Sequence, residues 1–284
     1  MLNEPFFFPL FALFSACFGA CVGSFLNVCI WRMPREESVV KPRSHCPHCG
    51  ILIPWYLNIP VLSWMLLRGK CASCKGPIAM RYMLVELLTA MLFLAVFMKW
   101  AIPDSLHLLP ISHGAMLPVY WLFLGGLILG TFIDFDHYIL PDTVTIGGMI
   151  VGPLLSMALP VMHGCEIWWQ GGLMSLLGLV VGFGLLFIVS VLGEKAFKKE
   201  AMGFGDVKLL GAIGAFLGWK AVLFTIFVSS FLGSVVGLLL ILSRNAKMQS
   251  RLPFGPYLSL AATIWVFYGP ALIGAYLKLM GTSF

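Results

Sequence analysis

The chain has 284 residues, of which 60% are hydrophobic and only 11% are charged, and its formal net charge is +6. Soluble domains carry about 25% charged residues, so this composition excludes an ordinary soluble globular protein. The long apolar runs favour membrane-spanning helices over the short alternating strands of a membrane β-barrel. The positive charges lie between apolar runs and form no basic, aromatic-interleaved groove, which argues against a nucleic-acid-binding protein.

The apolar runs predict eight membrane spans. In chain order they cover residues 6–30, 82–101, 117–133, 144–162, 171–192, 207–217, 221–242 and 257–279. The sixth and seventh runs are also compatible with one broken segment. We therefore expect an all-α polytopic membrane protein with three parts. These are a first transmembrane helix (1–30), a small polar insert (31–81) and a transmembrane core (82–284).

The basic residues predict how the chain is oriented. Of the 18 Lys and Arg, eight lie between residues 32 and 81, four between 195 and 208, and three between 244 and 251. Such clusters mark cytoplasmic loops, so we expect the insert in the cytoplasm and the N-terminus outside. A signal peptide is disfavoured, because no Lys or Arg precedes the first apolar run.

Four of the eight cysteines form two Cys-x-x-Cys pairs in the insert, Cys46 with Cys49 and Cys71 with Cys74, with 21 residues between the pairs. Each short gap lets one tight turn deliver two thiolates, and four thiolates suit tetrahedral Zn²⁺. Disulfides are disfavoured in the reducing cytoplasm. Such a site has no open ligand position, so we expect a structural zinc that helps a small insert to fold.

Two histidines beside the first pair, His45 and His48, could each replace one thiolate. The other four cysteines lie in or beside apolar spans and are interpreted as small buried hydrophobic residues. A zinc metallopeptidase is disfavoured, because four thiolates leave no position for a catalytic water and no His-Glu-x-x-His motif is present.

Carboxylates in or beside membrane spans are costly and are therefore candidates for function. Seven of the 12 acidic residues fall in predicted loops and are interpreted as solvated. The remaining five are Glu86, Asp134, Asp136, Asp142 and Asp206.

Two of these carboxylates could form a catalytic pair. The group around Asp134 and the residue Asp206 are about 70 positions apart but lie at the same predicted cytoplasmic depth. Two adjacent carboxylates cannot both ionise easily, so one activates water while the protonated one polarises a peptide carbonyl. The glycines beside Asp206 permit close approach by an extended substrate. The alternative is that these residues cap helices, which fits Asp142 well.

Several motifs occur together in a fixed order. They are Gly23–Val28 (Gly-Ser-Phe-Leu-Asn-Val) with Arg32–Pro34, the two Cys-x-x-Cys pairs, Arg81–Glu86 (Arg-Tyr-x-Leu-Val-Glu), the segment Asp134–Asp142, and Gly203–Asp206 (Gly-x-Gly-Asp). With these motifs the chain resembles, over almost its whole length, the type IV prepilin leader peptidases. These are bifunctional bacterial membrane enzymes of type IV pilus and type II secretion systems. Met83 is a departure, because the family commonly has Pro at that position.

The resemblance implies that Asp134 and Asp206 are the catalytic aspartates and that Asp136 is only a neighbour. It implies cleavage of prepilins or pseudopilins after a Gly at the cytoplasmic face of the inner membrane. It also implies methylation of the new N-terminus from S-adenosylmethionine. The residues that bind this methyl donor are unknown, and Glu86 and Gly23–Asn27 are candidates by position alone.

Two other classes of function compete with this one. An ion- or proton-coupled transporter would use Asp134 and Asp206 as ion sites, but such sites are expected near the membrane midplane rather than at its edge. A zinc-bearing membrane scaffold would have no activity. The sequence does not indicate an oligomeric state.

Overall fold

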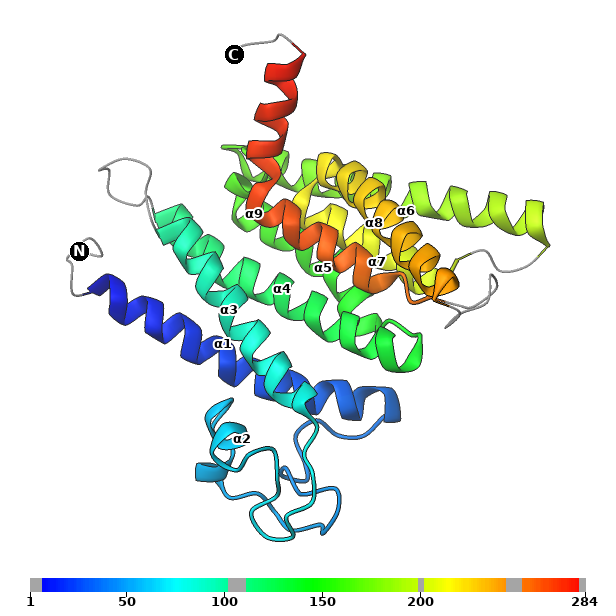
Figure 1. The fold of residues 1–284 in the computed structure, drawn as a ribbon. Helices are drawn as coiled ribbons and strands as arrows, with labels where there is room; N and C mark the ends of the chain where they lie inside the picture. The colour runs from blue at the N-terminus through cyan, green and yellow to red at the C-terminus, as the bar shows by residue number, and fades with distance from the viewer. Residues whose placement is uncertain (1–6, 102–110, 199–201, 244–251, 281–284) are drawn as a thin grey trace. The chain divides into compact units, whose positions relative to one another are not determined.

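The computed structural model describes residues 7–101, 111–198, 202–243 and 252–280, and most of the chain within these ranges is helical (Figure 1). The long helices are α1 (Phe7–Arg32), α3 (Met80–Ala101), α4 (Ile111–His137), α5 (Asp142–Ala158), α6 (Trp168–Phe197), α7 (Phe204–Leu217), α8 (Trp219–Leu242) and α9 (Gly255–Leu279). The start of the first predicted span and the whole basic cluster at 244–251 lie outside the described residues.

Each predicted apolar run falls on one of these helices, but the count of eight spans is not confirmed. Within the described ranges, six helices are long and apolar enough to cross a membrane, namely α1, α3, α4, α6, α8 and α9. The helix α5 has 17 residues and α7 has 14, both short of the roughly 20 that a span needs. The sixth and seventh runs are two helices, separated by Gly218, whose φ of +81° is a conformation that favours glycine.

The chain divides into two compact units, residues 1–129 and 130–284. In the first unit α1 and α3 pack along each other, and small residues on α1 let the two backbones approach closely. A Cβ at Gly19 would lie 2.8 Å from the Cβ of Phe93, and one at Gly23 would lie 2.7 Å from the Cα of Glu86. The polar insert forms the connection between these two helices.

The insert is built from turns and short helices rather than from a sheet. Its elements are η1 (Met33–Arg35), η2 (Trp55–Leu57) and α2 (Leu62–Leu66). Two isolated antiparallel bridges, His45 with Leu52 and Lys70 with Pro77, close its two cysteine loops. An insert of this size with so little regular structure needs a further source of stability.

In the second unit α7 is the central helix. It packs most extensively against α6 and also contacts α5, α8 and α9. Every residue from Asp206 to Phe216 is buried except Lys208. The contact with α6 depends on glycine, since a Cβ at Gly178 would lie 2.1 Å from the carbonyl oxygen of Gly214. A helix that is apolar on all sides is expected where neighbours surround it.

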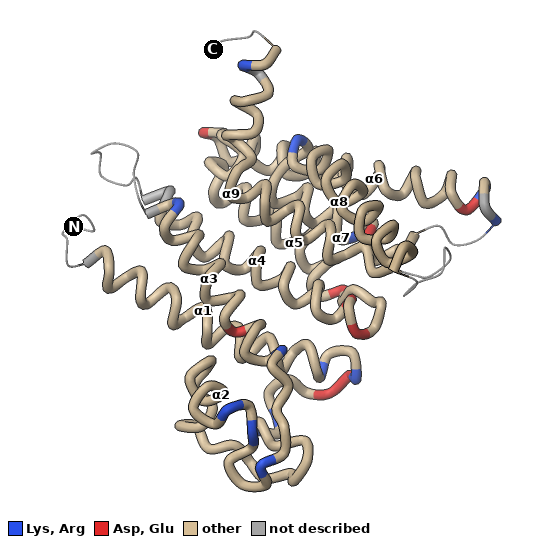
Figure 2. The backbone as a smooth tube through the Cα atoms, in the orientation of Figure 1, with Lys and Arg blue, Asp and Glu red and all other residues tan. Residues whose placement is uncertain are grey.

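The outward faces of this unit are apolar. Leu176, Val180 and Ile188 of α6 and Phe227 and Leu238 of α8 are all exposed. Figure 2 shows long stretches without charge along these helices, with Lys, Arg, Asp and Glu gathered toward their ends. Exposed apolar surface of this extent is what a lipid environment requires.

Candidate functional site

The two predicted catalytic aspartates lie in the second unit, each at the end of a helix. Asp134 is in the last turn of α4 and is 5% exposed, and Asp206 is in the first turn of α7 and is 9% exposed. Carboxylates with so little exposure are uncommon and need a structural or chemical reason.

Asp134 has a backbone donor that fixes one of its oxygens. The N–H of Gly255, the first residue of α9, donates a hydrogen bond of 3.1 Å to Asp134 Oδ2. A Cβ at Gly255 would lie only 2.7 Å from that same oxygen. Position 255 therefore accommodates Asp134 because it has no side chain.

The structure brings Asp134 and Asp206 into one neighbourhood, and Leu140 lies beside Gly205, which precedes Asp206, and beside Gly255, which contacts Asp134. A Cβ at Gly205 would lie 3.1 Å from the Cβ of Leu140, and one at Gly255 would lie 3.3 Å from Leu140 Cδ2. A negative charge on Asp134 repels a negative charge on Asp206, so the two carboxylates interact electrostatically. These contacts join the start of α7, the end of α4 and the start of α9 at one site.

The other two aspartates of this region have different environments. Asp136 is exposed, in contrast to Asp134 two residues earlier. Asp142 is not the N-cap of α5, contrary to the alternative considered above, because α5 begins at Asp142 and Pro141 is the N-cap residue. The Asp142 carboxylate instead pairs with the ammonium of Lys208 on α7. That ion pair joins the first turn of α5 to the second turn of α7.

The four predicted zinc ligands form one cluster in the first unit. The sulfur atoms of Cys46, Cys49, Cys71 and Cys74 all lie within 4.8 Å of one another, and the sulfurs of Cys46 and Cys74 are 3.8 Å apart. Tetrahedral Zn²⁺ with bonds of about 2.3 Å needs sulfurs about 3.8 Å apart. The cluster could therefore hold a zinc ion.

The two cysteine loops have the same backbone design. The N–H of Cys46 bonds the carbonyl of Ile51 at 3.0 Å, and the N–H of Cys71 bonds that of Gly76 at 2.9 Å. The residue after each pair has a left-handed backbone, with φ of +70° at Gly50 and +59° at Lys75. Hydrogen bonds from the backbone N–H groups of Cys74 and Ser73 lower the pKa of the Cys71 thiol to about 6, which favours the thiolate form of this one residue.

The histidines beside the first pair are not part of the sulfur cluster. His48 Nε2 lies 3.1 Å from the carbonyl oxygen of Pro77, so its ring joins one cysteine loop to the other. His45 Nδ1 lies 3.3 Å from the carbonyl oxygen of Arg43. Of the remaining cysteines, Cys29 is buried as expected, whereas Cys17 and Cys21 are exposed on α1.

Glu86, the fifth candidate carboxylate, lies in the second turn of α3 and is partly buried. It accepts a 2.7 Å hydrogen bond from the backbone N–H of Val61 in the insert, and the Ser24 hydroxyl of α1 also donates to it. Close by, the Asn27 amide donates to the carbonyl of Tyr82 at 2.9 Å. The candidate segment Gly23–Asn27 and Glu86 therefore do lie together.

The partners that fix these carboxylates were not predicted from the sequence. Gly255 lies in the run Pro253-Phe254-Gly255-Pro256, and a glycine between two prolines just before an apolar span was an available signal. Val61 and Leu140 had no such signal, since both are ordinary apolar residues whose neighbours come from distant parts of the chain.

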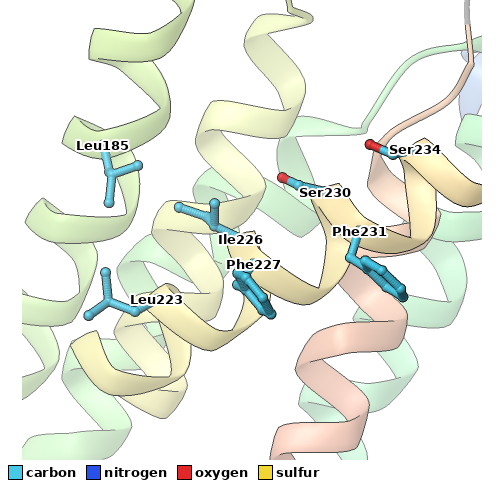
Figure 3. A pocket seen from close by; sticks show the side chains of 7 residues that line it. All are labelled: Leu185, Leu223, Ile226, Phe227, Ser230, Phe231 and Ser234. Atoms are coloured by element: carbon cyan, nitrogen blue, oxygen red, sulfur yellow. The ribbon is translucent and has the colours of Figure 1, made fainter.

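An apolar groove of about 450 Å³ lies on the face formed by α6 and α8 (Figure 3). Its lining is Leu185, Leu223, Ile226, Phe227, Ser230, Phe231 and Ser234. These side chains include no carboxylate, imidazole or thiol, so the groove offers no acid or base for hydrolysis.

Comparison with known proteins gives the family. The bacterial peptidase A24 N-terminal domain matches residues 17–100, and the type IV leader peptidase family matches residues 121–238. No solved structure matches the chain significantly.

Curated relatives match over nearly the whole chain, and those described here are each named prepilin leader peptidase/N-methyltransferase. The Myxococcus xanthus protein is 39% identical over 94% of this chain and 75% of its own length. The Aeromonas hydrophila protein is 39% identical over 95% of this chain and 94% of its own length. The Pseudomonas aeruginosa protein is 35% identical over 95% of this chain and 95% of its own length. The chain thus belongs to the type IV leader peptidase family.

Proposed function

We propose that this protein is a membrane aspartic endopeptidase that cleaves the leader peptide from type IV prepilins or type II secretion pseudopilins after a Gly. We further propose that it methylates the new N-terminus, with S-adenosylmethionine as methyl donor. The observation that best supports the peptidase is the buried pair Asp134 and Asp206, which share one neighbourhood at the ends of two helices. The names of the relatives support both activities.

Hydrolysis follows from the chemistry of such a pair. One aspartate holds a proton and donates it toward the scissile carbonyl, while the ionised one removes a proton from the attacking water. The hydrogen bond from the Gly255 N–H favours the ionised form of Asp134, so we assign Asp134 as the base and Asp206 as the proton donor. Hydrolysis of the peptide bond gives two products, a leader that ends in a carboxylate and a mature protein that begins with an amine.

The cysteine cluster is proposed as a structural zinc site. With four thiolates as ligands, the ion would have no position left for water or substrate. Bound zinc would hold the two cysteine loops together and so stabilise the insert. The chain's own residues would then perform the hydrolysis at the aspartate pair.

We place the protein in the bacterial inner membrane with the insert and the aspartate pair at the cytoplasmic face. The density of Lys and Arg in the insert supports this orientation. An ion- or proton-coupled transporter is not favoured, because the chain belongs to a peptidase family.

A cleavage assay tests the proposal directly. The purified chain in detergent is incubated with a prepilin, and the shortened product is followed on gels. We expect Asp134→Ala and Asp206→Ala each to lower cleavage by at least about 1000-fold, as loss of a catalytic group does in other hydrolases. Asp136→Ala is the matched control and should cleave at a rate close to that of the unmodified chain. If either of the first two variants cleaves normally, the assignment of the pair is wrong.

A further inference from the structure

Methyl transfer needs residues of its own, and the two matched regions suggest where they lie. Both proposed catalytic aspartates fall in the region matched by the leader peptidase family, residues 121–238. The N-terminal domain match, residues 17–100, contains Glu86 and the polar residues around it. We propose that Glu86 binds the α-amino group of the cleaved substrate and accepts the proton that this group loses on methylation. This inference rests on the proposed function.

Glu86 differs in position from the other carboxylates that the structure describes in the first unit. Glu36 and Glu37 follow α1 in the insert and are exposed to solvent. Glu86 lies inside a helix that is long and apolar enough to span a membrane, and it is partly buried. An ionisable side chain at such a position is costly and is a functional candidate by default.

The backbone around Val61 is strained where it contacts Glu86. Val61 has φ of +62° and ψ of −53°, a conformation that is rare for a β-branched residue. The N–H of Leu62 bonds the carbonyl of Pro60 at 2.6 Å, which makes this segment a γ-turn of the uncommon, strained type. The turn directs the Val61 N–H at Glu86 Oε2. Strain of this kind is found preferentially at functional sites.

The carboxylate retains hydrogen-bonding capacity for a ligand. A carboxylate can accept about four hydrogen bonds, and the Val61 N–H and the Ser24 hydroxyl provide two. Neighbouring Asn27 already donates to the Tyr82 carbonyl. A protonated α-amino group has three N–H donors and a positive charge, so it matches the remaining acceptor positions and the charge of Glu86.

The chemical step balances with Glu86 as the base. The ammonium of the substrate first gives a proton to Glu86, which frees the nitrogen lone pair. That pair forms the new N–C bond while the C–S bond of the sulfonium donor breaks, its electrons remaining on sulfur as a neutral thioether. Glu86 then releases its proton to water. A positioned carboxylate is a common base for such transfers.

A purely structural role is the main rival, and two substitutions separate it from the proposal. Glu86→Gln keeps the length of the side chain and its carbonyl oxygen but removes the charge. Glu86→Asp keeps the charge on a shorter side chain. If Glu86 only joins the insert to α3, Gln is the better substitute. If its charge binds and deprotonates an amine, Asp is the better substitute.

The experiment uses the full-length purified chain in detergent, a prepilin, and a peptide that already begins at the mature N-terminus. We expect Glu86→Gln to cleave prepilin within about twofold of the unmodified chain but to methylate the pre-cleaved peptide at least about 100-fold more slowly, as loss of a general base does. Glu86→Asp should retain more methylation than Glu86→Gln. Glu37→Gln, an exposed carboxylate of the same unit, is the control and should change neither activity.

Peptide binding without methyl donor gives a second readout. The unmodified chain should bind the free-amine peptide about tenfold more tightly than its N-acetylated form, and Glu86→Gln should lose this preference. Equal binding of the two peptides by the unmodified chain, or better methylation by Gln than by Asp, overturns the proposal. Weaker binding of S-adenosylmethionine to Glu86→Gln with an unchanged peptide preference also overturns it. Failure to cleave prepilin would count against the peptidase alone, because the pre-cleaved peptide bypasses that step.

Discussion

The backbone N–H of Gly255 donates a hydrogen bond to Oδ2 of Asp134 across 121 residues of sequence. This contact connects the first turn of α9 to the last turn of α4 and orients the aspartate that we assign as the base. A donor on the backbone cannot be lost by rotation of a side chain, so the orientation of this carboxylate depends on where α9 begins.

Gly255→Ala should impair cleavage without unfolding the chain. The added Cβ would lie 2.7 Å from Asp134 Oδ2, so the carboxylate must move or lose its hydrogen bond. A displacement of about 1 Å at a catalytic group can lower a rate about 100-fold, and we expect a loss of that order in the rate of prepilin cleavage. Gly147→Ala on α5 is the control, because nothing lies within 4 Å of its new Cβ. Normal cleavage by Gly255→Ala would contradict the role given to this contact.

Gly178→Ala should destabilise the second unit. Its Cβ would lie 2.1 Å from the carbonyl oxygen of Gly214, so α6 and α7 must separate. Overpacking of this kind typically lowers the free energy of unfolding by about 1–3 kcal/mol. Gly184→Ala, six residues further along α6, meets nothing within 4 Å and should be neutral or stabilising, because Ala is the better helix former. Denaturation in detergent, followed by circular dichroism, measures the free energy of unfolding of both variants. Equal stability of the two variants would count against close packing of α6 and α7 at Gly178.

The Lys208–Asp142 ion pair should contribute only modestly to stability. The Lys208 side chain is 19% exposed but that of Asp142 is 63% exposed, so water screens the interaction. A double-mutant cycle with Lys208→Gln and Asp142→Asn should give a coupling energy of no more than about 1 kcal/mol in the free energy of unfolding. Raising the salt concentration should reduce it further. A coupling energy that is larger and independent of salt would show that the pair is shielded from solvent.

Removal of one thiolate should release the metal and loosen the insert. We expect about one zinc per unmodified chain, measured by atomic absorption, and a clear loss of zinc in Cys49→Ser. Hydrogen exchange should then become faster in residues 44–78, because the two cysteine loops are no longer held together. Cys17→Ser, which changes an exposed cysteine of α1, should retain the metal. An insert that keeps its protection without metal would contradict a structural zinc site.

Features set by nearby residues could be predicted from the sequence. The cysteine cluster is one, because each pair lies in a single turn and the spacing alone places two sulfurs together. The helices are another, because an apolar run must satisfy its own backbone in a membrane. The sequence did not distinguish two helices that meet at Gly218 from one bent helix, because a glycine is compatible with both.

Contacts between distant segments could not be predicted in the same way. Asp134 and Asp136 both end an apolar run, and only the packing of α9 and α7 distinguishes the buried residue from the exposed one. The strained turn at Val61 had no signal, because valine is a poor choice for a left-handed backbone. It is held in that conformation in the folded protein, where Glu86 accepts its N–H.

Under the proposed function, the length of α7 sets how deep in the membrane cleavage takes place. With 14 residues this helix is about 21 Å long, whereas a bilayer has about 30 Å of hydrocarbon and the neighbouring α6, with 30 residues, extends about 45 Å. Neighbouring helices surround α7, so its two ends need not reach the two membrane surfaces and its first turn can lie below the headgroups. In this geometry Asp206 would meet a substrate whose apolar helix is still embedded. Cleavage then requires no extraction of that helix from the bilayer, and the cost of moving its hydrophobic residues into water is avoided.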